Sequence, residues 1–382
     1  MNMDVLVQYF ARRNLGDDLF IHILAGAFPD CRLRLVGHPF FHPRGLPENV
    51  TLHPVSWSRL AWRCVQRVIG RDSALSHRIG KRNLYRLRSL ADRSEAYVNI
   101  GGSIFVDQGG AEIPFSGEGE PCLDWVSEVK ARDHHFLIGA NLGPMRTEDY
   151  PRRMYLALRT YTHVCLRDWA SYTMVRQLTQ AQYAPDLVFM LPQPEAVQTQ
   201  QRTVISVIDM HRVSGDAFLA DSYEQLMART ADELLDRGGQ VTLCAFCRSQ
   251  GDLAAARRIA GKMRGKAEIL CYNGDPAPVL EAIAAADHVI AGRFHAMILA
   301  LSWGKAVFPV AYDCKTRHYL EDLRFPGRWA APADIPRLTP ADVLENYDRR
   351  VICDCAAHRQ HAGNQLRALR TFVDAHKGQT NA

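Results

Sequence analysis

The sequence predicts an α/β protein made of two doubly wound domains, and three observations lead to this fold class. Short apolar runs of strand length alternate with helical segments, as in proteins with parallel sheets. With 382 residues, the chain is long enough for two domains that each bury a core. A polar stretch over 191–201 with two prolines interrupts the alternation, which then starts again. We therefore expect domains over 1–192 and 203–350 and a C-terminal helix over 351–382.

The first domain is predicted from apolar strands that end in turns or helices. Strands are expected over 3–10, 96–100, 136–140 and 163–166. A helix is expected over 17–27, and a second helix begins after Asp168, whose carboxylate can cap it. The strands are apolar throughout because a parallel sheet is covered on both faces.

The second domain repeats this pattern more regularly. Strands are expected over 203–208, 241–245, 268–270, 288–291 and 306–309. Helices are expected over 221–237, 252–264, 276–285, 294–303 and, as one long terminal helix, 356–376. Two Rossmann-like domains of this kind bind ligands at the carboxyl ends of their strands, so we expect the site in a cleft between them.

Composition and charge exclude several classes of protein. Hydrophobic residues make up 47% of the chain and charged residues 23%, which is ordinary for a globular protein and argues against disorder, collagen and a coiled coil. The formal net charge of +5 is too small for a dedicated nucleic-acid binder. No signal-peptide pattern is visible, and the longest apolar stretch, 296–312, is interrupted by Gly304 and Pro309, which argues against a membrane span. We expect a cytoplasmic protein without nucleic-acid partners.

The ten cysteines are scattered among the expected strands and helices. Cys244 and Cys247 form a C-x-x-C motif, but Cys244 lies inside an apolar strand. A redox pair would start a helix, and a zinc ribbon would need two well-spaced pairs. We therefore expect structural cysteines in a reducing compartment and no metal site.

Polar residues that follow strands are the candidates for chemistry, because ligands of doubly wound folds bind at that edge of the sheet. The loop after the first strand holds Asn14, Gly16, Asp17 and Asp18. A glycine here allows a ligand to approach closely, and the acids either cap the helix or place one carboxylate toward a ligand hydroxyl. Further along, Gly101 and Gly102 either form a simple turn or let backbone N–H groups face a ligand.

Three cationic side chains and one histidine follow later strands. Arg167 ends a strand and either pairs with an acid on the surface or binds an anion as a fork. Arg293 and His295 share one strand-to-helix turn, where the histidine is either structural or a group for proton transfer near neutral pH. Lys315 follows the last strand and either contacts an anion or is solvated.

Seven short motifs occur in order along nearly the whole chain. They are Asn14-Leu-Gly-Asp17, Gly101-Gly-Ser103, Gly143-Pro144, Leu166-Arg-Asp168 with Ser171, Ala184-Pro-Asp186, Arg293-Phe-His295 and Tyr312-Asp-Cys-Lys315. In this order they resemble the polysaccharide pyruvyl transferase family. The chain departs from the pattern in two places, since the glycine run after Ile100 is only two residues long and the stretch 57–93 matches no motif.

The resemblance implies a two-lobed fold similar to that of GT-B glycosyltransferases. It implies transfer of the pyruvyl group of phosphoenolpyruvate to two hydroxyls of a sugar in a polysaccharide or its precursor, which forms a cyclic ketal and releases phosphate. In that family the residues matching Arg167, Arg293 and the main chain of Phe294 hold phosphoenolpyruvate, and the residue matching His295 is the acid and base. Lys315 is a further candidate for the donor anion. Fixed arginines can stabilise the departing phosphate, so no cofactor or metal is expected.

Two other functions stay open at the level of sequence. A GT-B-type glycosyltransferase that uses a nucleotide sugar shares the fold, since fold does not determine function. Some enzymes of that class hold the donor with a pair of glutamates in the second domain, and no such pair occurs near Glu281. A non-catalytic glycan-binding protein would need the two lobes but not Arg167, Arg293 and His295.

The stretch 57–93 is rich in arginine and contains only two acids, Asp72 and Asp92. Over 57–68 the apolar residues form one stripe of a helix that also carries Arg59 and Arg63. The stripe either packs on the first domain, with the arginines in water, or lies on an anionic membrane that presents a lipid-linked acceptor. The second interpretation predicts peripheral contact with the inner face of the membrane.

Overall fold

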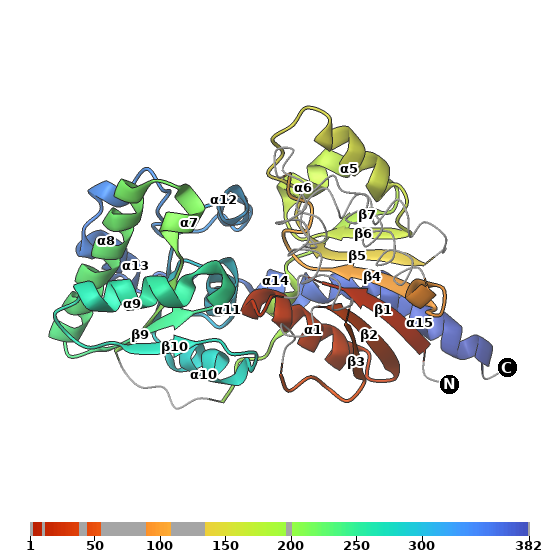
Figure 1. Cartoon of the computed structure of the whole chain (residues 1–382), viewed down its shortest axis with the longest axis horizontal. Coiled ribbons are helices and arrows are strands. Elements are labelled where there is room, and N and C mark those ends of the chain that lie inside the picture. The colour runs from red at the N-terminus through yellow and green to blue at the C-terminus, as the bar shows by residue number, and fades with distance from the viewer. Residues whose placement is uncertain are drawn as a thin grey trace, which may run out of the picture.

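The computed structural model describes residues 3–9, 12–37, 44–54, 89–107, 134–195 and 201–380. Within these residues the chain folds into two α/β units that lie side by side (Figure 1), each built on one parallel sheet. The predicted fold class is therefore confirmed. The helix expected over 57–68 lies outside the described residues, so both interpretations of the basic stretch stay predictions.

The first unit contains a seven-stranded sheet with the order β3-β2-β1-β4-β5-β6-β7, in which all neighbouring strands are parallel. The strands are β1 (Met3–Gln8), β2 (Cys31–Gly37), β3 (Val50–Pro54), β4 (Ala96–Ile100), β5 (His135–Ala140), β6 (His163–Leu166) and β7 (Ala181–Tyr183). The sequence prediction missed β2, because Arg32 and Arg34 interrupt its apolar run. It also missed β3 and β7, which are short strands at the two edges of the sheet.

The second unit contains a five-stranded parallel sheet with the order β10-β9-β8-β11-β12. The strands are β8 (Arg202–Val207), β9 (Gln240–Ala245), β10 (Glu268–Cys271), β11 (His288–Ala291) and β12 (Ala306–Pro309). Each of them lies within one residue of its predicted bounds. Four of the five are continuous runs of mostly buried residues, whereas the edge strand β10 is exposed or half-buried. Cys244 and Cys247 are free and buried, as expected of structural cysteines.

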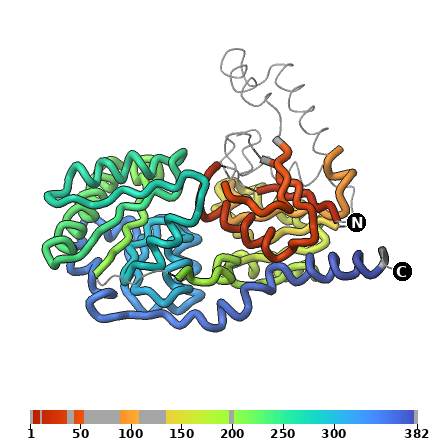
Figure 2. The backbone as a smooth tube through the Cα atoms, turned by 90° about the horizontal axis from the view of Figure 1, so that it is seen from below, coloured from red at the N-terminus to blue at the C-terminus, as the bar shows by residue number. Residues whose placement is uncertain are grey.

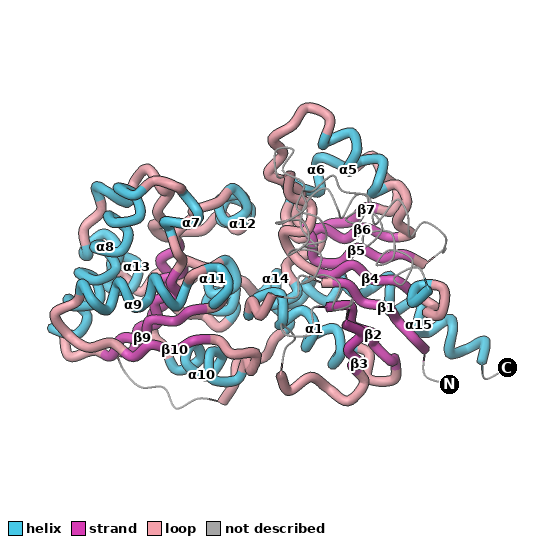
Figure 3. The backbone as a smooth tube through the Cα atoms, viewed as in Figure 1, coloured by secondary structure: helices cyan, strands magenta, loops and turns pink. Residues whose placement is uncertain are grey.

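Helices connect the strands of both sheets (Figure 3). The first unit contains α1 (Leu15–Ala27), α5 (Tyr150–Leu158), α6 (Trp169–Val175) and the 3₁₀ helix η1 (Leu187–Met190). The second unit contains α7 (Met210–Ser214), α8 (Ala217–Asp236), η2 (Arg248–Gln250), α9 (Asp252–Lys262), α10 (Ala277–Ala285), α11 (Phe294–Ser302), α12 (Cys314–Asp322), η3 (Ile335–Arg337) and α13 (Pro340–Asp348). Asp168 caps α6 through the Ser171 N–H, as predicted. No helix in the described part of the chain is long and apolar enough to cross a membrane.

The C-terminal segment returns to the first unit. It consists of α14 (Ala356–His361), the 3₁₀ helix η4 (Ala362–Leu366) and α15 (Arg367–Thr380), and Figure 2 shows it running from the second unit along the first. The prediction of one continuous helix over 356–376 is wrong, because η4 breaks it. The side chain of Gln365 in η4 accepts a hydrogen bond from Gly139 N–H and donates one to the carbonyl of Ala184, which fits this turn to the first sheet.

The two sheets meet near the carboxyl ends of their central strands. The strand order changes direction between β1 and β4 in the first sheet and between β8 and β11 in the second. Leu15 N–H at the start of α1 donates a hydrogen bond of 3.2 Å to the carbonyl of Phe246, which directly follows β9. The backbones of the two units are therefore in contact where doubly wound folds bind ligands.

Candidate active site

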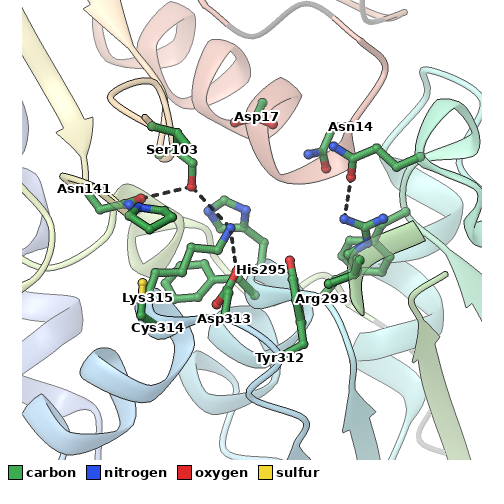
Figure 4. Close-up of a pocket in the computed structure, with 18 of the residues that line it drawn as sticks. Asn14, Asp17, Ser103, Asn141, Arg293, His295, Tyr312, Asp313, Cys314 and Lys315 are labelled. Carbon is green, nitrogen blue, oxygen red and sulfur yellow. Dashed lines mark hydrogen bonds and ion pairs between the residues drawn. The ribbon is translucent and has the colours of Figure 1, made fainter. Parts of the chain in front are cut away.

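A cavity of about 440 Å³ lies between the two units. Its walls come from loops that follow β1, β4, β5 and β6 in the first unit and β8, β9, β11 and β12 in the second. Figure 4 shows His295 between Lys315 and Arg293, with Asp17 and Asn14 on the side of α1. The polar lining residues include Asn14, Asp17, Ser103, Asn141, Arg167, Arg212, Gln250, Arg293, His295, Tyr312, Asp313 and Lys315.

His295 enters the cavity from the first turn of α11. Its Nε2 lies 3.4 Å from Asp186 Oδ2 and 3.3 Å from Arg167 Nη1. Phe20 and Phe294 meet the ring edge to face, each with 5.1 Å between the ring centroids. Burial lowers the pKa of His295, and Asp186 opposes this shift. A neutral imidazole at this position can accept a proton and return it.

Arg167 follows β6 and is 2% exposed. Its Nη1 donates to Asp186 Oδ2 (2.9 Å), its Nη2 donates to Asn141 Oδ1 (2.6 Å), and its guanidinium lies 4.4 Å from the centre of the Phe294 ring. Burial by itself would raise the pKa of Asp186, but His295 and Arg167 hold it at about 2. Arg167 therefore pairs with an acid, and this pair is buried in the cavity wall instead of lying on the surface.

Arg293 is held from behind by a buried carboxylate. Its Nε donates to Asp252 Oδ2 (3.0 Å), its Nη2 donates to Asp252 Oδ1, and its Nη1 donates to Gln250 Oε1. Burial raises the pKa of Asp252, and the charge of Arg293 opposes that shift. A guanidinium has five N–H donors. Contacts with Asp252 and Gln250 use three of them, so within the described part of the chain two N–H groups are left for a ligand, and the direction in which they point is fixed.

Lys315 adds a cation from the start of α12. Its Nζ lies 3.1 Å from Asp313 Oδ2 and 3.2 Å from Ser103 Oγ, so the lysine reaches across to the loop that follows β4 (Figure 4). Burial by itself would lower the pKa of Lys315, but the carboxylate of Asp313 raises it. The amine is therefore protonated at neutral pH and faces the cavity.

Two glycines leave the space that these side chains occupy. A Cβ on Gly16 would lie 1.8 Å from His295 Nδ1, and a Cβ on Gly102 would lie 2.3 Å from Arg167 Nη2. The close approach expected at Gly16 is thus made by a side chain of the protein itself, and the same holds at Gly102. Gly101 has a φ of +149° and is not part of the lining of the cavity.

The adjacent acids of α1 point in different directions. Asp17 lines the cavity together with Asn14. Asp18 is completely buried and accepts a hydrogen bond of 2.6 Å from the hydroxyl of Tyr272, which belongs to the second unit. Burial raises the pKa of Asp18 well above its ordinary value. Asp17 is therefore the acid that can face a ligand, and Asp18 belongs to the contact between the units.

Several residues that shape the site were not proposed as site residues from the sequence. Asn141 and Gln250 line the cavity, and Asp252 lies behind Arg293. Asp186 and Asp313 belong to two of the motifs but were given no function of their own. Asn141 directly follows β5, so the rule that ligands bind after strands could have found it. Asp252 lies 41 residues before Arg293, and no local pattern reveals that pairing.

One group of described side chains has the spacing of a metal site, namely His211, Asp221 and Glu224. Its carboxylates are already neutralised, because Lys262 Nζ lies 2.7 Å from Glu224 and 3.3 Å from Asp221. Arg258 Nε donates a further hydrogen bond of 2.6 Å to Glu224. A metal ion would have to displace two cations, so we assign no metal to this group.

The two parallel sheets and the cavity between them define the class of two-domain proteins with a GT-B-like fold. Solved structures of this class align over nearly the whole chain. A glycosyltransferase from Rickettsia africae is 8% identical with a TM-score of 0.53, over 98% of this chain and 98% of that chain. The spinosyn rhamnosyltransferase SpnG is 12% identical with a TM-score of 0.51, over 96% of each chain. At these identities the likeness shows the fold alone.

The sequence places the chain more narrowly within this class. The sequence model of the polysaccharide pyruvyl transferase family matches residues 14–313. The chain therefore belongs to this family, as the order of its motifs predicted, and is a transferase. A search of curated proteins gives no significant match.

Proposed function

We propose that the protein transfers the pyruvyl group of phosphoenolpyruvate to two hydroxyls of one sugar, in a polysaccharide or its precursor, and releases phosphate. The observation that supports this most is that one cavity gathers His295 with Arg167, Arg293 and Lys315. Phosphoenolpyruvate carries a carboxylate and a phosphate close together, and guanidinium groups bind both anions in a bidentate manner. Membership of the family supports the pyruvyl group as the group transferred.

The donor is proposed to lie against the second unit. Arg293 and Lys315 lie on either side of His295 in Figure 4, and two N–H groups of Arg293 have no contact with Asp252 or Gln250. The main-chain N–H of Phe294 is the first of α11, where the helix dipole favours an anion. Arg167 adds positive charge from the first unit, so donor binding would use both units.

In the proposed reaction His295 moves protons. The first sugar hydroxyl forms a bond to C2 of the donor while C3 takes up a proton. The second hydroxyl then forms a bond to C2 while the bond from C2 to the phosphate oxygen breaks. Of the two hydroxyl protons, one ends on C3 and the other leaves with the phosphate. Arg293 and Lys315 stabilise the departing phosphate, and a single histidine that accepts and returns a proton serves each step.

The acceptor is proposed to bind on the side of the first unit. Asn14 and Asp17 line the cavity there, and amide and carboxylate groups are suited to hydrogen bonds with sugar hydroxyls. The backbone of Gly102 borders the same wall. We also propose that the acceptor is a lipid-linked glycan and that the protein is cytoplasmic and contacts the inner face of the membrane. Sedimentation with lipid vesicles tests this part separately.

The decisive experiment measures phosphate release from phosphoenolpyruvate with a panel of galactosides, glucosides and mannosides. We expect release with at least one acceptor, a product with the mass of a pyruvyl ketal, and no inhibition by a chelator. His295→Gln is the matched control and should release no phosphate above background. Transfer from a nucleotide sugar, without phosphate release from phosphoenolpyruvate, would replace the proposal by glycosyl transfer.

A further inference from the structure

Asp186 connects the two units at the reactive histidine. It caps η1 in the first unit and is completely buried. Its Oδ1 accepts a hydrogen bond from Val188 N–H, and its Oδ2 accepts one from Arg167 Nη1, both at 2.9 Å. The same Oδ2 lies 3.4 Å from Nε2 of His295, which belongs to the second unit. The carboxylate is therefore fixed on both oxygens before any ligand binds.

We propose that Asp186 is a positioning residue that accepts the Nε2 proton of His295, so that Nδ1 is the nitrogen that exchanges protons with the substrates. The proposal rests on the proposed function, in which His295 is acid and base. A neutral imidazole carries its proton on one nitrogen, and the hydrogen bond of that nitrogen decides which one it is. Contacts of this kind are often long in unliganded enzymes and tighten when substrates bind.

Nε2 of His295 has two polar neighbours, and only one of them can accept its proton. The guanidinium of Arg167 has donors but no acceptor, whereas the carboxylate of Asp186 is an acceptor. When His295 takes up a second proton, its Nε2–H can therefore be satisfied by Asp186 and not by Arg167. Without Asp186, the imidazolium would lie against Arg167 with no balancing charge.

Nδ1 of His295 lies on the other side of the ring. It is in contact with Gly16 in the first turn of α1, where a Cβ would be only 1.8 Å away. The neighbouring residues Asn14 and Asp17 line the cavity on that side. Nδ1 therefore faces the wall on which the acceptor is proposed to bind, and the backbone at Gly16 must move aside for a hydroxyl to meet it.

The charged groups around His295 come from four elements. Asp186 of η1 favours the protonated ring, whereas Arg167 after β6 and Lys315 of α12 disfavour it. Asp17 of α1 also lines the cavity. Because a carboxylate within this distance shifts a neighbouring pKa by about 1–3 units, loss of Asp186 should lower the pKa of His295 by that amount.

The experiment is a titration of the full chain labelled with ¹⁵N in histidine, followed by long-range ¹H–¹⁵N spectra. His295→Gln identifies the His295 signals by their loss. In the unchanged protein we expect a neutral ring that is protonated on Nε2 and bare at Nδ1. In Asp186→Asn we expect the pKa of His295 to fall by about 1–3 units. In the plot of kcat against pH, the change in rate caused by titration of His295 should move to lower pH by the same amount.

Asp252→Asn is the matched control, since Asp252 is also a buried carboxylate paired with a cavity arginine but has no contact with His295. It should leave the pKa of His295 unchanged. A neutral ring protonated on Nδ1, or an unchanged pKa in Asp186→Asn, would overturn the proposal. The tautomer is read from the unchanged protein, so a poorly folded variant does not prevent a decision. These spectra need no turnover, so absence of phosphate release would overturn only the proposed function.

Discussion

His295 Nδ1 and the backbone of Gly16 are in such close contact that a methyl group on Gly16 would lie 1.8 Å from the nitrogen. Gly16 belongs to α1 of the first unit, and His295 belongs to α11 of the second. The contact therefore crosses the boundary between the units at the reactive group. The imidazole of His295 can occupy its position only because Gly16 has no side chain.

Gly16→Ala is expected to lower kcat by about tenfold or more, because the added methyl group must displace the imidazole that moves the protons. The KM for phosphoenolpyruvate should change much less, since Arg293 and Lys315 are not touched. Alanine is a better helix former than glycine by about 1 kcal/mol, so α1 itself should not weaken. Initial rates of phosphate release, measured over a range of donor concentrations, separate the two parameters.

Gly26→Ala is the matched control for Gly16→Ala. Gly26 lies in the same helix, and a Cβ there meets no other atom within 4 Å. We expect unchanged kinetics and a slightly higher melting temperature. Equal activity of the two alanine variants would show that the position of His295 does not limit the reaction.

Gly102→Ala is expected to act on donor binding. The new Cβ would lie 2.3 Å from Arg167 Nη2 and would push the guanidinium away from Asn141. Loss of a charge-assisted contact to the donor costs about 1.5–3 kcal/mol, so the KM for phosphoenolpyruvate should rise by roughly tenfold or more. Gly261→Ala, where a Cβ meets nothing within 4 Å, is the control. A KM equal to that of the control would remove Arg167 from the donor site.

Arg293 has two functions that a double variant can separate. Arg293→Met should weaken donor binding and also destabilise the fold by about 3–5 kcal/mol, because it leaves the buried carboxylate of Asp252 without its cation. Adding Asp252→Asn removes the buried charge and should restore most of the stability, while donor affinity stays low. Denaturant unfolding and calorimetric titration with phosphoenolpyruvate give the two readouts. Recovery of donor affinity in the double variant would contradict the role assigned to Arg293.

Lys315 and Arg212 both line the cavity but differ in exposure. The side chain of Lys315 is 22% exposed, and that of Arg212 is 61% exposed. Water screens the exposed charge, so Arg212→Met should change donor affinity by less than about threefold. Lys315→Met should weaken it by roughly tenfold or more. Similar losses in both variants would mean that the donor binds near the rim of the cavity instead of beside His295.

The fold could be predicted from the sequence because its elements have few alternatives. Every residue of β11 and α11 is buried and most are apolar, which is typical of the inner layers of a parallel-sheet protein. The edge strands β3 and β7 and the polar strand β2 could not be predicted, because their sequences lack a continuous apolar run. The break at η4 depends on Gln365, whose partners are distant in the sequence.

The site could be predicted in part, because its residues follow strands. Arg167, Arg293, His295 and Lys315 all come after strands, and all four line one cavity. The pairing of Arg167 with Asp186, and of Arg293 with Asp252, depends on how separate loops pack, and no local pattern contains that information. For the same reason the sequence left open which acid of α1 faces the ligand.

Asp18 makes the stability of the protein depend on pH. Burial raises its pKa well above the ordinary value of 3.8, so the folded state keeps a proton that the unfolded chain releases. The stabilising contribution is fully present below the unfolded pKa and is lost as pH rises toward the folded pKa. In that window the free energy of unfolding falls by about 1.4 kcal/mol per pH unit.

Asp18→Asn is expected to remove this fall, because an amide does not titrate. The free energy of unfolding of the variant, relative to that of the unchanged protein, should therefore rise as pH increases above about 4. The hydrogen bond from Tyr272 lowers the pKa of Asp18, so Tyr272→Phe should raise that pKa while it keeps the carboxyl itself. The fall should persist in this variant and extend to higher pH. Urea unfolding at several pH values measures the slopes, and equal slopes for Asp18→Asn and the unchanged protein would show that Asp18 is ionised in the folded state.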